Sequence, residues 1–283
     1  MAIALIASAL AACGGGGSDS STATAPPVVS TPALTPAPAT GKWSPAVGDT
    51  WQWQLRGTVN TSYDVAIYDV DLIDVAQATI DQLHRQGRRV VCYFSAGSSE
   101  DFRSDASAFQ PADMGGKLEG WAGERWLDIR SASVRQFMTQ RRLDLAAAKG
   151  CDGVEPDNVD GYANSTGFAL TASDQLDYNR FLATEAHRRN LKVGLKNDLD
   201  QAALLVNDFD FAVNEQCHEF GECDKLRPFT AAAKPVFNAE YRADYRNNTG
   251  EARTTLCSTA KAESIRTLVL PLELDGTFRY SCG

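Results

Sequence analysis

From Trp43 onward, short apolar runs alternate with amphipathic segments along the chain. Apolar runs of this length predict strands, and apolar residues at helical spacing predict helices. Expected strands are 51–55, 65–69, 89–95, 153–157, 192–197, 209–215, 235–241 and 267–273. Expected helices are 74–86, 131–149, 173–190, 199–206 and 254–264. Eight strands separated by helices predict an α/β fold, a single-domain (β/α)8 TIM barrel over residues 43–283. A doubly wound sheet is the alternative, although no glycine-rich phosphate turn follows the first strand.

The segment before Trp43 predicts two further regions. Residues 1–13 form a short apolar run of small and aliphatic residues that ends at Cys13, typical of a signal peptide with a bacterial lipobox. We expect Cys13 to be lipidated; an ordinary signal peptide with an incidental cysteine is the alternative. Residues 14–42 are mostly Gly, Ser, Thr, Ala and Pro, without an aromatic residue, and predict a disordered linker. The expected location is the bacterial cell envelope, as an outer-membrane lipoprotein, or the exterior as a secreted protein.

The charge of the chain restricts its partners. The chain has 283 residues, of which 43% are hydrophobic and 22% charged, with a net charge of −9. This excess of acids argues against nucleic acid and against anionic membrane surfaces, so we expect membrane contact only through the lipid anchor. A cationic ligand suits an acidic protein better. We expect a monomer and no cofactor.

Seven cysteines leave an even number once Cys13 is set aside. In an exported chain this favours disulfides. Cys217 and Cys223 enclose a short loop, and a Cys257–Cys282 bond would fix the C-terminus; Cys92 and Cys151 could pair or stay as buried thiols. A metal at Cys217, His218 and Cys223 is the weaker interpretation, and calcium at 152–160 lacks the EF-hand spacing.

Polar residues gather where the predicted strands end. In a barrel these ends converge on one face and form a single cleft. The residues expected to bind substrate there are Asp69, Tyr93, Glu155, Asn158, Asp160, Tyr162, Lys196, Asn197, Asp198, Asn214, Glu240 and Tyr241. Tyr93, Tyr162 and Tyr241 are the aromatic residues expected to stack on sugar rings.

Two carboxylates across a cleft are what glycoside hydrolysis requires, one as acid and one as nucleophile or base. Asp157 and Glu215 suit these roles because each ends an apolar strand. A purely structural role, capping a helix or pairing with Lys196 or an arginine, is the alternative for either acid. The residues alone do not decide which carboxylate is the nucleophile.

Six segments together resemble glycoside hydrolase family 114, the endo-α-1,4-polygalactosaminidase family. They are IYDVDLIDV (67–75), VVCYFSAGSSEDFRSD (90–105), WLDIRS (126–131), GCDGVEPDNVDGY (150–162), VGLKND (193–198) and FAVNEQC (211–217). The resemblance implies a (β/α)8 fold and hydrolysis of α-1,4-linked galactosamine polymers by a retaining mechanism. It implies Asp157 as nucleophile and Glu215 as acid/base. A surface lipoprotein that binds an amino-sugar polymer without cutting it is the alternative.

Overall fold

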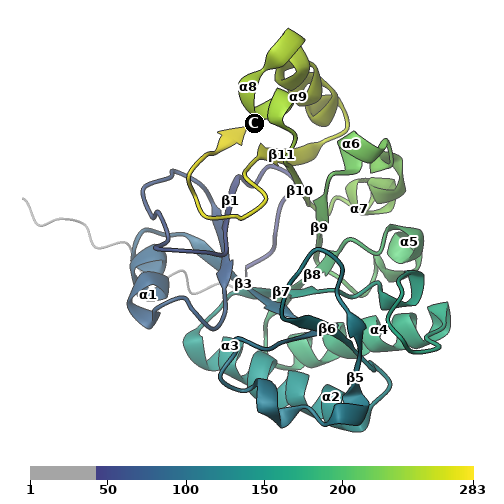
Figure 1. Ribbon diagram of the computed structural model, residues 1–283. Coiled ribbons are helices and arrows are strands. Elements are labelled where there is room, and N and C mark those ends of the chain that lie inside the picture. Colours follow the sequence, from purple (N-terminus) through teal and green to yellow (C-terminus); the bar gives the residue numbers. More distant parts are fainter. Residues whose placement is uncertain (1–42) are drawn as a thin grey trace, which may run out of the picture. The chain divides into compact units, whose positions relative to one another are not determined.

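A computed structural model of the chain describes residues 43–283. Its centre is a curled sheet of eight parallel strands with helices outside it (Figure 1). Along the sheet the parallel strands are β1 (Trp51–Gln54), β2 (Ile67–Asp71), β3 (Arg89–Ser95), β7 (Gly153–Asp157), β8 (Lys192–Lys196), β9 (Phe211–Glu215), β10 (Val236–Glu240) and β11 (Ile265–Val269). The predicted α/β barrel is therefore confirmed.

Helices follow most of these strands, but not the first and the last. The helices are α1 (Gln77–Arg85), α2 (Ala132–Phe137), α3 (Asp144–Lys149), α4 (Ala172–Arg188), α5 (Ala202–Leu205), α6 (Cys217–Phe220), α7 (Arg227–Ala231), α8 (Ala243–Asn247) and α9 (Ala252–Ala262). A π-helical turn, Met138–Leu143, joins α2 to α3, so the segment predicted as one helix over 131–149 is helical throughout with an internal irregularity. Short 3₁₀ turns lie at 106–108, 111–113, 161–163, 199–201, 223–226 and 249–251.

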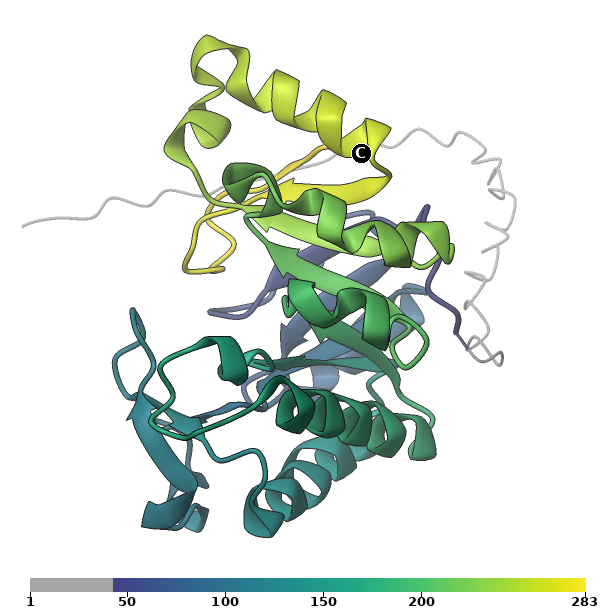
Figure 2. The same ribbon diagram turned by 90° about the vertical axis from the view of Figure 1, so that its right-hand side faces the viewer.

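An antiparallel insert interrupts the barrel after β3. It contains β4 (Ser98–Glu100), β5 (Met114–Lys117) and β6 (Glu124–Leu127), in the order β4-β6-β5. The hydrophobic pattern did not predict these strands. Figure 2 shows the teal insert and the yellow loop before β12 (Tyr280–Ser281) on the same side of the barrel.

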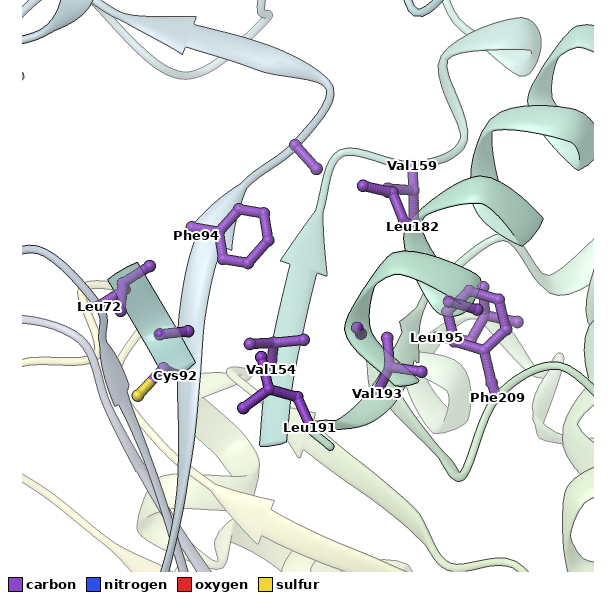
Figure 3. Packing of buried hydrophobic residues seen from close by; sticks show 14 of the residues in the cluster. Leu72, Cys92, Phe94, Val154, Val159, Leu182, Leu191, Val193, Leu195 and Phe209 are labelled. Carbon is purple, nitrogen blue, oxygen red and sulfur yellow. The ribbon is translucent and has the colours of Figure 1, made fainter. Parts of the chain in front are cut away.

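Strand alternation divides the apolar side chains into two cores. One lies inside the barrel, where Trp51 of β1 contacts Phe237 of β10 at 5.2 Å between ring centroids. The other lies between the sheet and the helices, where Val154 and Val193 pack near Leu182 of α4 (Figure 3). Successive residues of a strand point to opposite sides of the sheet. Alternate positions along each strand therefore face the barrel interior, and the positions between them face the helices.

The C-terminal segment joins the two ends of the row of strands. β12 pairs antiparallel with β11, and the Arg279 guanidinium donates to the Trp51 carbonyl of β1 at 2.8 Å. The Trp51 indole N–H donates in turn to the Arg266 carbonyl of β11 at 2.9 Å. The barrel is thus closed by side chains and the C-terminal loop.

Three disulfides brace the barrel: Cys92–Cys151, Cys217–Cys223 and Cys257–Cys282. The expected disulfides are present, and Cys92 pairs with Cys151. Disulfides are typical of proteins that fold outside the reducing cytosol, in agreement with the expected export. The predicted signal peptide (1–13), lipidated Cys13 and linker (14–42) lie outside the described residues. Within residues 43–283 no helix has the length and apolar character needed to cross a membrane.

Two predicted strands were displaced. β2 was predicted at 65–69 and lies at Ile67–Asp71; β11 was predicted at 267–273 and lies at Ile265–Val269. The predicted β2 ended at Asp69 although the strand continues to Asp71, which is a buried acid. A pattern of apolar residues does not identify a buried acid as part of a strand.

Candidate active site

A cleft of about 510 Å³ opens at the carboxyl ends of the parallel strands. Its walls come from the loops after β7, β8 and β9, from the insert and from the loop before β12. Eight carboxylates line it against two lysines, Lys196 and Lys225. The acids are Glu119, Glu124, Asp157, Asp160, Asp198, Asp200, Glu215 and Glu222. The cleft is therefore strongly electronegative.

Lys196, at the end of β8, is the centre of the site. Its ammonium nitrogen contacts Glu155 Oε1 at 3.0 Å, Asp157 Oδ1 at 3.1 Å and Glu215 Oε2 at 3.3 Å. We call these four residues the lysine-centred group. Burial alone would lower the pKa of Lys196, but the charges of Asp157, Glu155 and Glu215 outweigh it and raise that pKa well above its usual value. Lys196 therefore stays charged although it is only 2% exposed.

Asp157, the last residue of β7, is held by three donors. The Tyr93 hydroxyl donates to Oδ2 at 2.9 Å, and the Asn158 backbone N–H donates to Oδ1 at 2.8 Å. Lys196 supplies the third contact. Burial, with the charge of Asp157 next, raises the pKa of Tyr93 well above its usual value, so the tyrosine remains a donor. All these contacts stabilise a negative charge on Asp157.

Glu215, the last residue of β9, has a matching set of partners. The Tyr241 hydroxyl donates to Oε1 at 2.5 Å, and the Asn197 side-chain amide donates to Oε2 at 3.4 Å. Asn197 also accepts the Glu215 backbone N–H at 3.0 Å, which fixes the end of β9 against β8. The side chain of Glu215 is 25% exposed and opens into the cleft.

Asp69 and Glu155 form a buried layer beside Lys196. Asp69 is 2% exposed and Glu155 is fully buried. Among the described residues no hydrogen-bond donor reaches Asp69 Oδ1 or either carboxylate oxygen of Glu155, although Glu155 Oε1 lies 3.0 Å from the Lys196 ammonium. Burial, followed by the charge of Glu155, raises the pKa of Asp69 well above its usual value. Neither residue lines the cleft.

Asp160, Asp198 and Tyr162 line another wall of the cleft. Asp198 is 4% exposed and accepts a hydrogen bond from the Asn179 amide at 2.8 Å. It follows Asn197, and both adopt left-handed backbone, with φ of 45° and 48°. Burial, then the charge of Asp160, raises the pKa of Asp198 to about 8; burial and Asp157 raise that of Asp160 to about 6. Neither acid forms an ion pair with a described residue.

The structure brings most of the predicted residues together. Tyr93, Asp157, Asn158, Asp160, Tyr162, Lys196, Asn197, Asp198, Asn214 and Glu215 line the cleft. Asp69, Glu155 and Tyr241 lie behind it and reach it through Lys196 or Glu215.

Glu240 does not reach the cleft. In β10 the interior positions are Phe237 and Ala239, so Glu240 has the opposite parity. Its carboxylate accepts the His218 backbone N–H at 2.9 Å and the Asn238 side-chain amide at 3.1 Å. The prediction placed it at the mouth because it ends a strand, without weighing the direction of its side chain.

The predicted alternatives for metal chemistry find little support. Cys217 and Cys223 form a disulfide, so their sulfurs are not available as thiolate ligands. His218 lies near Thr267, with 3.3 Å between Nε2 and the hydroxyl oxygen.

Several cleft residues were not predicted as candidates. The insert supplies Trp121, Glu124 and Trp126, and α6 supplies Phe220. The two tryptophans were not among the predicted stacking residues, which were all tyrosines. The strand pattern did not mark Glu124, because the insert has no clear apolar alternation. An acid in a segment with nearby tryptophans was the only available indication.

The family model for glycoside hydrolase family GH114 matches residues 32–283. The chain belongs to glycoside hydrolase family 114. It is 43% identical to Ega3 from Aspergillus fumigatus, solved in complex with galactosamine; the match covers 86% of this chain and 98% of Ega3, with a TM-score of 0.80. The resemblance noted in the sequence is thus confirmed, and the protein is a glycosidase.

More distant structures share only the fold. The glycoside hydrolase domain of PelA from Pseudomonas aeruginosa is 16% identical, with a TM-score of 0.62 over 81% of this chain and 96% of that domain. A D-allulose 3-epimerase from Methylomonas sp. is 10% identical, with a TM-score of 0.50 over 80% of this chain and 84% of the epimerase. No curated protein sequence matches the chain significantly.

Proposed function

We propose that this glycoside hydrolase is endo-acting and cleaves α-1,4-linked galactosamine polymers by a retaining mechanism. The observation that carries the proposal is the pair Asp157 and Glu215, which end β7 and β9 on either side of β8, line one open, acidic cleft and contact the same lysine. Galactosamine is the sugar in the Ega3 complex, and Ega3 is 43% identical to this chain.

The spacing of the pair supports retention. Asp157 Oδ1 and Glu215 Oε2 contact the same Lys196 nitrogen at 3.1 Å and 3.3 Å. The distance between these two oxygens therefore cannot exceed the sum of the two contact distances. Retaining enzymes hold their carboxyl groups about 5–5.5 Å apart, whereas inverting enzymes leave about 6.5–9.5 Å for a water. The shared lysine favours the shorter spacing.

The exposure of the two carboxylates also favours one assignment of roles. The side chain of Glu215 is 25% exposed and that of Asp157 is 17% exposed, so Glu215 is the more accessible to a glycosidic oxygen and to water, as an acid/base must be. Asp157 then attacks the anomeric carbon, and the glycosidic oxygen leaves with a proton from Glu215. Water, deprotonated by Glu215, breaks the Asp157 ester and restores the original anomeric configuration.

The charge of the cleft supports a cationic polymer. Deacetylated galactosamine carries an ammonium group, and the cleft has six more carboxylates than lysines. Asp160 and Asp198 form no ion pair with described residues and are placed to meet such a group. Because the cleft is open, an internal segment of a long polysaccharide can lie in it, as endo-cleavage requires.

The cellular location belongs to the same proposal. The LAAC sequence ending at Cys13 and the linker after it support a lipid-anchored envelope enzyme. Metabolic labelling with a fatty-acid analogue tests this: we expect label on the wild type and none on Cys13→Ser.

Reducing-end release from partly deacetylated α-1,4-galactosaminan tests the activity. We expect the wild type to release oligosaccharides of several lengths, and Asp157→Asn and Glu215→Gln to lose at least about a thousandfold in rate. Equal, background-level signal from all three proteins would contradict hydrolysis. If the wild type then still bound the polymer, the protein would be a binding lipoprotein.

A further inference from the structure

The cleft continues beyond the catalytic pair into a second cavity of about 290 Å³. The cleft and this cavity share six lining residues: Leu55, Tyr93, Trp121, Glu124, Leu272 and Leu274. A polymer chain that leaves the reaction centre in this direction must therefore pass between the insert and the loop before β12. Both lie on the same side of the barrel in Figure 2.

Trp121 is an exposed aromatic side chain at this passage. It lies in the loop that joins β5 to β6 and is 41% exposed. The Arg56 guanidinium carbon lies 6.0 Å from the centroid of its ring, and the indole also lines both the cleft and the second cavity. An indole that lines a cleft offers a flat apolar surface on which one face of a pyranose ring stacks.

Glu124 lies three residues later, at the start of β6. One carboxylate oxygen accepts the Ser98 hydroxyl at 2.7 Å, and Ser98 is held by Ser95 with 2.7 Å between the hydroxyl oxygens. The side chain is thereby fixed in orientation. No cation among the described residues lies within ion-pair distance of it. Burial, opposed by the Ser98 hydrogen bond, raises the pKa of Glu124 to about 7.

We propose that Trp121 and Glu124 form an amino-sugar subsite beside the reaction centre: the indole carries the ring, and the carboxylate binds its ammonium group. This inference rests on the proposed function, because it needs a polymer with free amino groups. A bound ammonium supplies the cation that Glu124 lacks, and the carboxylate then ionises more readily. An N-acetylated sugar offers no charge to this carboxylate, so the subsite selects deacetylated units.

The subsite is connected to the proposed nucleophile, Asp157. Asn158 donates to Ser95 Oγ at 2.9 Å through its side chain, and its backbone N–H donates to Asp157. Glu124, Ser98, Ser95 and Asn158 thus form a chain of hydrogen bonds that ends at Asp157. A sugar bound at Glu124 is therefore linked through these hydrogen bonds to Asn158, the residue whose backbone N–H positions Asp157.

Calorimetry with galactosamine oligomers and their fully N-acetylated counterparts tests the subsite. In an Asp157→Asn background, which prevents turnover, we expect Glu124→Gln to weaken binding of the deacetylated oligomer about tenfold and to leave the acetylated oligomer unchanged. Trp121→Ala should weaken both oligomers by a similar factor, because stacking does not depend on charge.

Asp101→Asn is the matched control. It removes one negative charge from the same insert, but Asp101 lines neither the cleft nor the second cavity. We expect no change in affinity for either oligomer. Equal affinities of the Asp157→Asn parent and its Glu124→Gln variant for the deacetylated oligomer would overturn the subsite, as would an equal loss caused by Asp101→Asn.

The two proposals fail differently. If the wild type releases reducing ends from the polymer but Glu124→Gln and Trp121→Ala bind as it does, only the subsite is wrong. If the wild type neither cuts nor binds galactosamine oligomers, the proposed function and the subsite fall together.

Discussion

Two sets of carboxylates share the cleft and differ in what neutralises them. The lysine-centred group places Glu155, Asp157 and Glu215 around one buried ammonium. Glu124, Asp160 and Asp198, which we call the wall acids, have no ion-pair partner among residues 43–283, and their pKa values are raised to about 7, 6 and 8. The same residue types are therefore found in two settings: the first set is neutralised by a cation of the protein, and under the proposed function the second set is neutralised by the ammonium groups of the substrate.

Lys196→Met tests the first set and should have the largest effect. Three acids would lose their shared cation while Glu155 remains fully buried. Breaking a buried ion pair on one side costs about 3–5 kcal/mol, and we expect the free energy of unfolding to fall by that order. Activity should fall by at least about a hundredfold. Urea unfolding and initial rates on the polymer measure both.

Lys225→Met is the control for Lys196→Met. Lys225 also lines the cleft but is 42% exposed in its pairs with Asp200 and Glu222. Such a pair is worth under about 1 kcal/mol. If both substitutions lowered the free energy of unfolding equally, the ion pairs of Lys196 would contribute no more than those of an exposed lysine. The contrast between the lysine-centred group and the wall acids would then be wrong.

Substitution of Asp69 sharpens the account of the buried layer. If Asp69 is a protonated donor to Glu155, Asp69→Asn keeps a donor at that position and Asp69→Ala does not. We expect Asp69→Ala to lower the free energy of unfolding by about 1–3 kcal/mol and Asp69→Asn to cost clearly less. Chemical denaturation of both variants decides the point. A larger cost for asparagine than for alanine would argue that Asp69 is ionised.

Asp198→Asn tests the wall acids and should have the smallest effect. Folding raises the pKa of Asp198, so between about pH 4 and pH 8 the folded state keeps a proton that the unfolded state has lost. Stability of the wild type therefore falls as pH rises through this window. We expect Asp198→Asn to flatten this dependence and to gain on the order of 1–2 kcal/mol at pH 9 relative to pH 5. Unchanged slopes in denaturation at the two pH values would contradict an unneutralised Asp198.

The sequence predicted those parts of the fold whose local pattern is complete. β3 and β7 were predicted at 89–95 and 153–157, and both have those bounds: β3 contains a continuous apolar run, and β7 lies between the helix-ending Gly150 and the polar loop after Asp157. The insert was missed because MGGK and ERWL, the sequences of β5 and β6, have no apolar alternation. Their pairing depends on partners far along the chain, which local patterns do not reveal.

The candidate site follows the same division. Strand ends identified Asp157, Lys196 and Glu215 as members of one cleft, since parallel strands converge. The central position of Lys196 depends on the tilt of the strands around the barrel. That tilt cannot be predicted from the local sequence pattern. Glu240 shows the opposite error, because its place at a strand end was visible but the direction of its side chain was not considered.

The most direct test of the account is the chemical identity of the nucleophile. An α-1,4-galactosaminobiosyl fluoride needs no acid to leave, so Glu215→Gln should form the ester on Asp157 faster than it hydrolyses it. Mass spectrometry of the digested protein should find the added disaccharide on the peptide that contains Asp157. A disaccharide attached to any other residue, or release of the inverted anomer with no adduct, would contradict the assignment of Asp157 as nucleophile.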